Sequence, residues 1–147
     1  GFYTRIIFEQ LKTKNVTKAI DIACKFLDVQ NKSIRLAETI IPHLLLTGDI
    51  EKALTLANTI PEDYPRSWAF QLIIPHLITQ GNIDDAITHA IAIPDGDIQS
   101  YFLTYSMIPS LLFNGKADEA TSLTYHISRP YLKEVALNKI RKYQELS

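Results

Sequence analysis

The sequence has little cysteine and no long apolar run. Its single cysteine, Cys24, has no partner for a disulfide within the chain, so packing must supply the stability, which suits a reducing compartment such as the cytoplasm. The longest strongly apolar stretch, residues 40–46, is far shorter than the roughly 18 residues of a membrane-spanning helix. We therefore expect no membrane segment. The 46% hydrophobic content over 147 residues allows one domain with a real core.

Motifs that carry catalytic chemistry are also missing. The chain has no glycine-rich phosphate loop, no cysteine pair, no HExxH and no GxSxG, so we expect neither an enzyme nor a cofactor. The net charge is only −1, but it is uneven. Residues 1–35 carry seven basic and three acidic side chains (+4), whereas residues 48–97 carry two basic and eight acidic ones (−6). This asymmetry serves solubility and can also steer a charged partner.

A repeat of 33 and then 34 residues is the strongest signal in the chain. Pro, Gly, Ala and Ile recur together in three copies, with offsets of 6, 5 and 7 residues kept in each. The copies are Pro42, Gly48, Ala53 and Ile60; Pro75, Gly81, Ala86 and Ile93; and Pro109, Gly115, Ala120 and Ile127. A fourth, eroded copy lies upstream, where residues 14–19 correspond to residues 48–53. Identities in a shared register indicate a repeated structural unit.

Each repeat has the pattern of a helical hairpin. Apolar residues at steps of three and four flank the turn glycine on both sides, as in two amphipathic helices. The glycine allows a left-handed end to the first helix, the Asp or Asn beside it caps the second, and Pro61 and Pro94 stop the second helices. The expected helices are 2–13, 15–29, 32–47, 49–60, 65–80, 82–92, 97–114, 116–127 and 130–146.

These hairpins predict an all-α fold, an α-α superhelix (solenoid) of about four hairpins within a single domain of residues 1–147. The expected repeats are residues 1–30, 31–63, 64–96 and 97–129, followed by a capping helix at 130–146. The string from Gly48 to Leu54, Gly-Asp-Ile-Glu-Lys-Ala-Leu, resembles the turn and second-helix start of a tetratricopeptide repeat, and the 34-residue period agrees. The second helix is one turn shorter than in that family, and the first helix contains a proline, as in HEAT repeats.

The prolines at 42, 75 and 109 fall inside the expected first helices. An interior proline removes one hydrogen bond and costs about 3 kcal/mol, so each should have a structural reason. We expect a kink at each proline, with the carbonyl four residues earlier losing its usual partner.

The tetratricopeptide resemblance implies a binding groove along the first helices. Positions thirteen and ten residues before each turn glycine would line it: Arg35, Glu38, Trp68, Gln71, Phe102 and Tyr105. These positions vary between copies, unlike the steadily apolar row of residues 40, 73 and 107. Aromatic anchors beside polar groups suit a protein or peptide partner, although Trp68 and Phe102 are equally well explained by packing between repeats.

The sequence therefore predicts a protein- or peptide-binding scaffold. RNA binding is an alternative, because helical repeats of similar length read RNA, but residues 48–97 offer only Lys52 and Arg66 to a phosphate backbone. An architectural role within a larger protein is another. A metal site is not expected: His43 and His76 are equivalent, but the third copy has Ser110 there, and zinc needs four close ligands.

Overall fold

The computed structural model describes residues 1–146, which contain no β-strand, so the predicted all-α class is confirmed. The elements are α1 (Phe2–Lys12), α2 (Val16–Phe26), α3 (Val29–Arg35), η1 (Leu36–Ile40), α4 (Ile41–Leu46), α5 (Ile50–Asn58), α6 (Asp63–Thr79), α7 (Ile83–Ile91), α8 (Gly96–Phe102), η2 (Leu103–Met107), α9 (Ile108–Phe113), α10 (Ala117–Leu123), η3 (Thr124–His126) and α11 (Pro130–Glu145). Each expected helix is present, with ends that differ by three residues or fewer when consecutive elements such as α10 and η3 are taken as one helical run.

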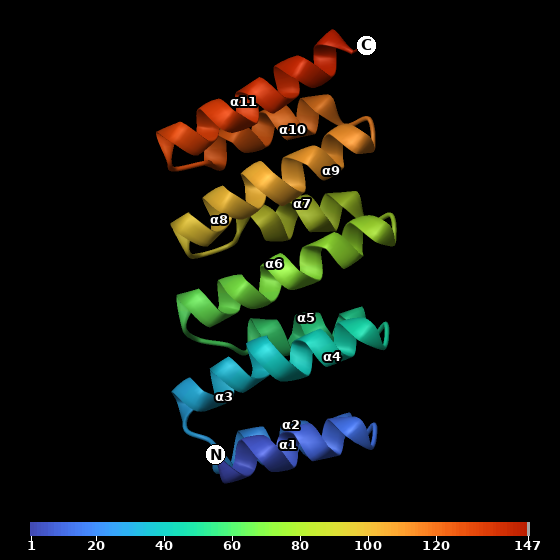
Figure 1. The fold of residues 1–147 in the computed structure, drawn as a ribbon, viewed down its shortest axis with the longest axis vertical. Helices are drawn as coiled ribbons and strands as arrows, with labels where there is room; N and C mark the ends of the chain where they lie inside the picture. Colours follow the sequence, from blue (N-terminus) through green and yellow to red (C-terminus); the bar gives the residue numbers. More distant parts are fainter. Residues whose placement is uncertain (147) are drawn as a thin grey trace. The chain divides into compact units, whose positions relative to one another are not determined.

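The chain divides inside α6 into two compact units, Gly1–His76 (unit 1) and Leu77–Ser147 (unit 2). In unit 1, α1 packs against α2 and α4 packs against α5 (Figure 1). In unit 2, α9 packs against α10, and α11 contacts α8, η2, α9 and α10. Fully buried aliphatic side chains form the two cores: Ile7, Leu36, Ile40, Ile41 and Ile60 in unit 1, and Leu103, Met107, Ile108, Leu111 and Leu123 in unit 2.

The hairpin turns have the backbone geometry that the sequence predicted. Gly48, Gly81 and Gly115 have φ angles of +83°, +84° and +73°, so all three lie in the left-handed region. In the eroded first copy the corresponding residue is Lys14, which has a φ of +61°. A residue with a Cβ pays a conformational cost there that glycine does not.

We therefore expect opposite effects from substitutions at equivalent turns. Gly81→Val should lower the free energy of unfolding by about 1–2 kcal/mol, and Lys14→Gly should raise it by about 0.5 kcal/mol, because the left-handed strain outweighs the extra freedom of an unfolded glycine. A Cβ at Gly81 would meet no atom within 4 Å, so the backbone conformation alone is tested. Urea denaturation followed by circular dichroism measures both. Equal signs for the two changes would contradict the argument.

Two of the three long first helices contain a π-helical turn that the sequence analysis did not predict. The helical run from Val29 to Leu46 contains η1, and the run from Gly96 to Phe113 contains η2. In each, an N–H donates to the carbonyl five residues earlier: Ile41 to Leu36, and Ile108 to Leu103. Both turns end directly before the Ile-Pro pair of the repeat.

A π turn adds one residue to a helix and widens it, which moves preceding carbonyls away from the ring of a proline that follows. Pro42 and Pro109 come directly after such turns, whereas Pro75 lies inside the regular helix α6. All three prolines therefore lie inside helical runs, as predicted. At Pro42 and Pro109, the π turn makes room for the proline ring within the helical run.

The spacing of three buried serines reflects the residue that each π turn adds to its helix. Ser33, Ser67 and Ser100 are each 1% exposed or less. Ser33 and Ser100 lie nine residues before the repeat proline, and Ser67 lies eight residues before it. The difference of one residue is the π turn. The Ser33 hydroxyl donates to Glu62 Oε1 at 2.5 Å, and the Ser100 hydroxyl accepts from the Ser128 N–H at 3.2 Å, so each serine ties an inter-hairpin loop to a first helix.

One hydroxyl group within η2 is buried and makes no hydrogen bond to the described residues. Thr104 is fully buried, and its Oγ1 has no hydrogen-bond partner among the described residues. Thr104→Val keeps the shape and removes this desolvated group, so it should raise the free energy of unfolding by about 1 kcal/mol. Thr124→Val is the matched control: Thr124 is also buried, but its hydroxyl donates to the Thr121 carbonyl at 2.6 Å. That change should be neutral or destabilising. A loss of stability in both variants would contradict the prediction.

Candidate functional site

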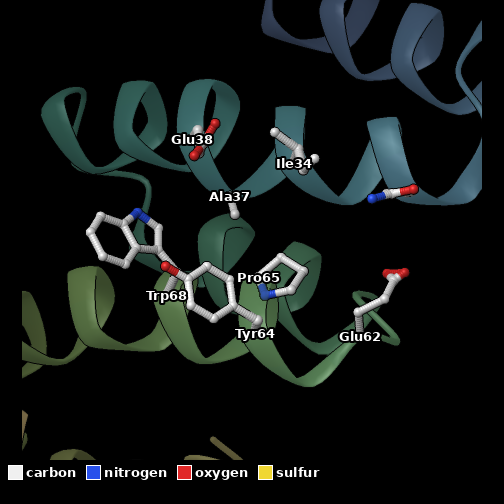
Figure 2. Close-up of a pocket in the computed structure, with 8 residues that line it drawn as sticks. Ile34, Ala37, Glu38, Glu62, Tyr64, Pro65 and Trp68 are labelled. Atoms are coloured by element: carbon white, nitrogen blue, oxygen red, sulfur yellow. The ribbon is translucent and has the colours of Figure 1, made fainter. Parts of the chain in front are cut away.

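A surface pocket of about 470 Å³ lies in unit 1, between the first helix of one repeat and the first helix of the next. Its lining residues are Gln30, Ile34, Ala37, Glu38, Glu62, Tyr64, Pro65 and Trp68. In Figure 2 the rings of Trp68 and Tyr64 lie beside each other on α6, and Glu38 lies on the facing helix. A shallower groove of about 390 Å³ borders Glu38 on the other side, where α1 meets η1 and α4.

Two residues predicted for the groove, Glu38 and Trp68, line this pocket together. Trp68 is 38% exposed, so its ring is accessible at the surface. Arg35 is adjacent: its guanidinium lies 3.1 Å from the Thr39 hydroxyl and 3.4 Å from Glu38 Oε2. Gln71 is half-buried further along α6 and does not line the pocket.

The two carboxylates of the pocket are held differently. Glu62, in the loop before α6, accepts the hydrogen bond from Ser33, which fixes its position in a partly buried setting. Glu38 is more exposed and pairs with Arg35, whose guanidinium lies 3.4 Å from Glu38 Oε2. A carboxylate has two oxygens and about four acceptor sites, so both groups keep capacity for a further donor. The pocket thus combines an aromatic wall with two acceptors of negative charge.

Phe102 does not lie where the sequence predicted. Its side chain is only 5% exposed and belongs to the core of unit 2, whereas the preceding residue, Tyr101, is 49% exposed. Phe102 lies thirteen residues before the turn glycine Gly115, and the π turn η2 lies between them. One extra residue in that turn rotates the preceding part of the helix by about 100° relative to the expected register. Phe102 therefore faces the core, and Tyr101 faces the solvent in its place.

Counting from the buried serines avoids this error. The residues that follow the three serines are Ile34, Trp68 and Tyr101. Ile34 and Trp68 line the pocket, and Tyr101 is exposed on unit 2. The recurring serine was present in the sequence as a signal, but only the structure shows why its spacing to proline changes. Glu62 and Tyr64 were missed for another reason: they precede the expected helix 65–80 and lie in the loop before α6 and in its first turn. Pro65 is the first residue of that expected helix.

A second group of exposed aromatic side chains lies on unit 2. The rings of Tyr101 and Tyr105 are stacked, with centroids 6.2 Å apart and planes at 21°. Arg129 lies 5.6 Å from the centroid of Tyr101, and Lys139 lies 5.1 Å from that of Tyr105. Arg129 also donates to Asp97 Oδ1 at 2.9 Å, and this hydrogen bond raises the pKa of Arg129 above its usual value. We call Tyr101, Tyr105, Arg129 and Lys139 the tyrosine surface; it contains Tyr105, another residue that the sequence predicted.

Within residues 1–146 no group of three or more His, Cys, Asp or Glu side chains is placed to hold a metal ion. We expect the melting midpoint, followed by circular dichroism, to stay within about 1 °C when excess EDTA is added, because a structural metal would contribute directly to folding free energy. A fall of many degrees would instead indicate a site that involves His43 or His76. Copper or zinc added back after chelation would identify it.

No helix in the described part of the chain is long and apolar enough to cross a bilayer. Comparison of the chain with protein-family models, with curated proteins and with solved structures found no match.

Proposed function

We propose that this chain is a protein- or peptide-binding module built from tetratricopeptide-like helical hairpins, which stack as a solenoid and bind their partner along the first helices. The observation that carries the proposal is the pocket of unit 1, where Trp68 and Tyr64 stand exposed beside Glu38 and Glu62. Large aromatic side chains gathered around a pocket are typical of binding sites, because they bury much area at little entropic cost.

The repeated frame supports the same proposal. Core positions such as Ile40 and Ile73 are kept and fully buried. The positions that follow the buried serines change from the half-buried Ile34 to the exposed Trp68 and Tyr101. Helical repeats use this division to present different side chains on one scaffold. A partner would then be recognised by a row of unlike residues rather than by one reactive group.

The tyrosine surface favours a second candidate function, binding of single-stranded RNA. Stacked rings flanked by Arg129 and Lys139 resemble the aromatic platforms on which bases stack. Two observations weigh against it. Arg129 is already paired with Asp97, and a nucleic-acid track needs many more basic side chains than the acidic middle of the chain supplies.

Selection from a random peptide library displayed on phage, with the whole chain as bait, tests the proposal. We expect enrichment of peptides that share a motif and bind in solution, measured by fluorescence polarisation. Labelled oligouridylate is titrated in parallel. Failure to enrich any peptide, together with salt-dependent binding of the oligonucleotide, would reject peptide binding in favour of RNA binding.

A further inference from the structure

We propose that the pocket of unit 1 binds an arginine side chain of a peptide partner. Its guanidinium would donate to the carboxylate of Glu38 and lie against the rings of Tyr64 and Trp68, while Glu62 adds negative charge at the other end of the pocket. This inference rests on the proposed peptide-binding function and adds the chemistry of the residue that the pocket recognises.

The shape of the pocket suits a long side chain with a charged end. Ile34, Ala37 and Pro65 supply an apolar lining, and the volume of about 470 Å³ leaves room for the peptide segment beside the side chain. Arginine and lysine bury a stem of methylene groups against such a surface while the charged end reaches polar partners. A short polar side chain would leave the apolar lining uncovered.

The charge of the pocket selects a cation. Glu38 and Glu62 are the charged residues that line it. Arg35 lies outside the lining and is paired with Glu38 at 3.4 Å, so a ligand guanidinium would compete with this exposed ion pair. An acidic peptide would place a carboxylate near Glu38 or Glu62, and like charges in a partly desolvated site repel each other. The hydrogen bond from Ser33 holds Glu62 in place before any ligand arrives, so little ordering is needed on binding.

The aromatic wall favours a guanidinium over an ammonium. Arginine is planar, stacks on aromatic rings and donates five N–H groups in a fixed fork, whereas lysine presents a strongly hydrated point charge. In Figure 2 the ring of Trp68 and that of Tyr64 flank one side of the pocket, and Glu38 lies across from them. A flat cation can therefore contact the rings and donate to a carboxylate at once.

Trp68 is the single tryptophan of the chain, so its fluorescence reports on this pocket alone. The probes are acetylated and amidated pentapeptides, Ala-Leu-Xaa-Leu-Ala, in which Xaa is arginine, citrulline, lysine or glutamate. Citrulline matches arginine in shape but carries no charge. We expect the arginine peptide to change the Trp68 emission saturably, the citrulline peptide to bind at least about tenfold more weakly, the lysine peptide to fall between them, and the glutamate peptide not to bind.

Single substitutions in the whole chain test whether the two carboxylates contribute to binding of the arginine peptide. Glu38→Gln and Glu62→Gln should each weaken the arginine peptide by about three- to tenfold and leave the citrulline peptide unchanged. Glu51→Gln, which removes an exposed carboxylate on α5 outside the pocket, is the matched control and should change neither. Circular dichroism checks that all three variants remain helical.

Equal affinity for the arginine and citrulline peptides would overturn the inference, and so would equal affinity for arginine and lysine. In either case peptide binding itself would stand. No response of Trp68 to any of the peptides would also overturn it, while the unbiased library selection decides separately whether the chain binds peptides at all.

Discussion

Replacing Ala53 by phenylalanine should lower the free energy of unfolding by about 3 kcal/mol, because overpacking a closed site forces shifts of backbone and neighbouring side chains. Ala53 is fully buried in α5, which packs against α4 and η1. Ala19, Ala86 and Ala120, its counterparts in the other repeats, are also 0% exposed. The recurring alanine therefore sets how closely the two helices of a hairpin approach. Urea denaturation followed by circular dichroism measures the loss.

Thr55→Phe on the exposed face of the same helix is the control for this prediction. It adds a similar bulk where no neighbour must move, so its effect should stay within about 0.5 kcal/mol. If the two variants lose stability equally, the cost comes from the helix propensity of phenylalanine and not from the packing of α5.

Truncating Trp68 to alanine should weaken binding of the library-selected peptides by about 1–4 kcal/mol, the range of an aromatic anchor at the centre of an interface. The fold should remain helical, because the indole is 38% exposed and the neighbouring core residues Ala69 and Phe70 are unchanged. Fluorescence polarisation of labelled peptides gives the affinity, since the variant has no tryptophan to report it.

Phe113→Ala is the matched control for this binding test. Phe113 is 90% exposed and lies in α9, outside the pocket, so its loss removes a similar aromatic surface without touching the site. Unchanged binding by Trp68→Ala, or equal weakening by both variants, would remove the pocket from the binding surface.

The helices and their turns could be predicted from the sequence because each is set by local chemistry. Gly48, Gly81 and Gly115 mark the left-handed turns. Pro61 and Pro94 mark the ends of second helices. Helical periodicity then fills the segments between them. These signals act within a few residues, so one sequence is enough to read them.

The candidate site could be predicted only in part, because it depends on the rotation of one helix about its axis. Glu38 and Trp68 line one pocket, whereas Phe102, expected on the surface, is buried. Both π turns interrupt the relation between sequence spacing and helix face, and no residue type marks them. Glu62 is brought in by the path of the loop before α6, and Tyr64 lies in the first turn of α6, ahead of the expected helix start; periodicity describes neither.

The π turns have a consequence for anyone who redesigns this chain by exchanging segments between its repeats. In a helix with an added residue, the halves before and after the insertion are out of phase by about 100°, so they obey different numbering rules. A graft from α6 into the helix that contains η2 must be counted from Ser67 and Ser100 for its first half, and from Pro75 and Pro109 for its second half. A transfer that uses one offset throughout would turn the intended surface row into the hydrophobic interior.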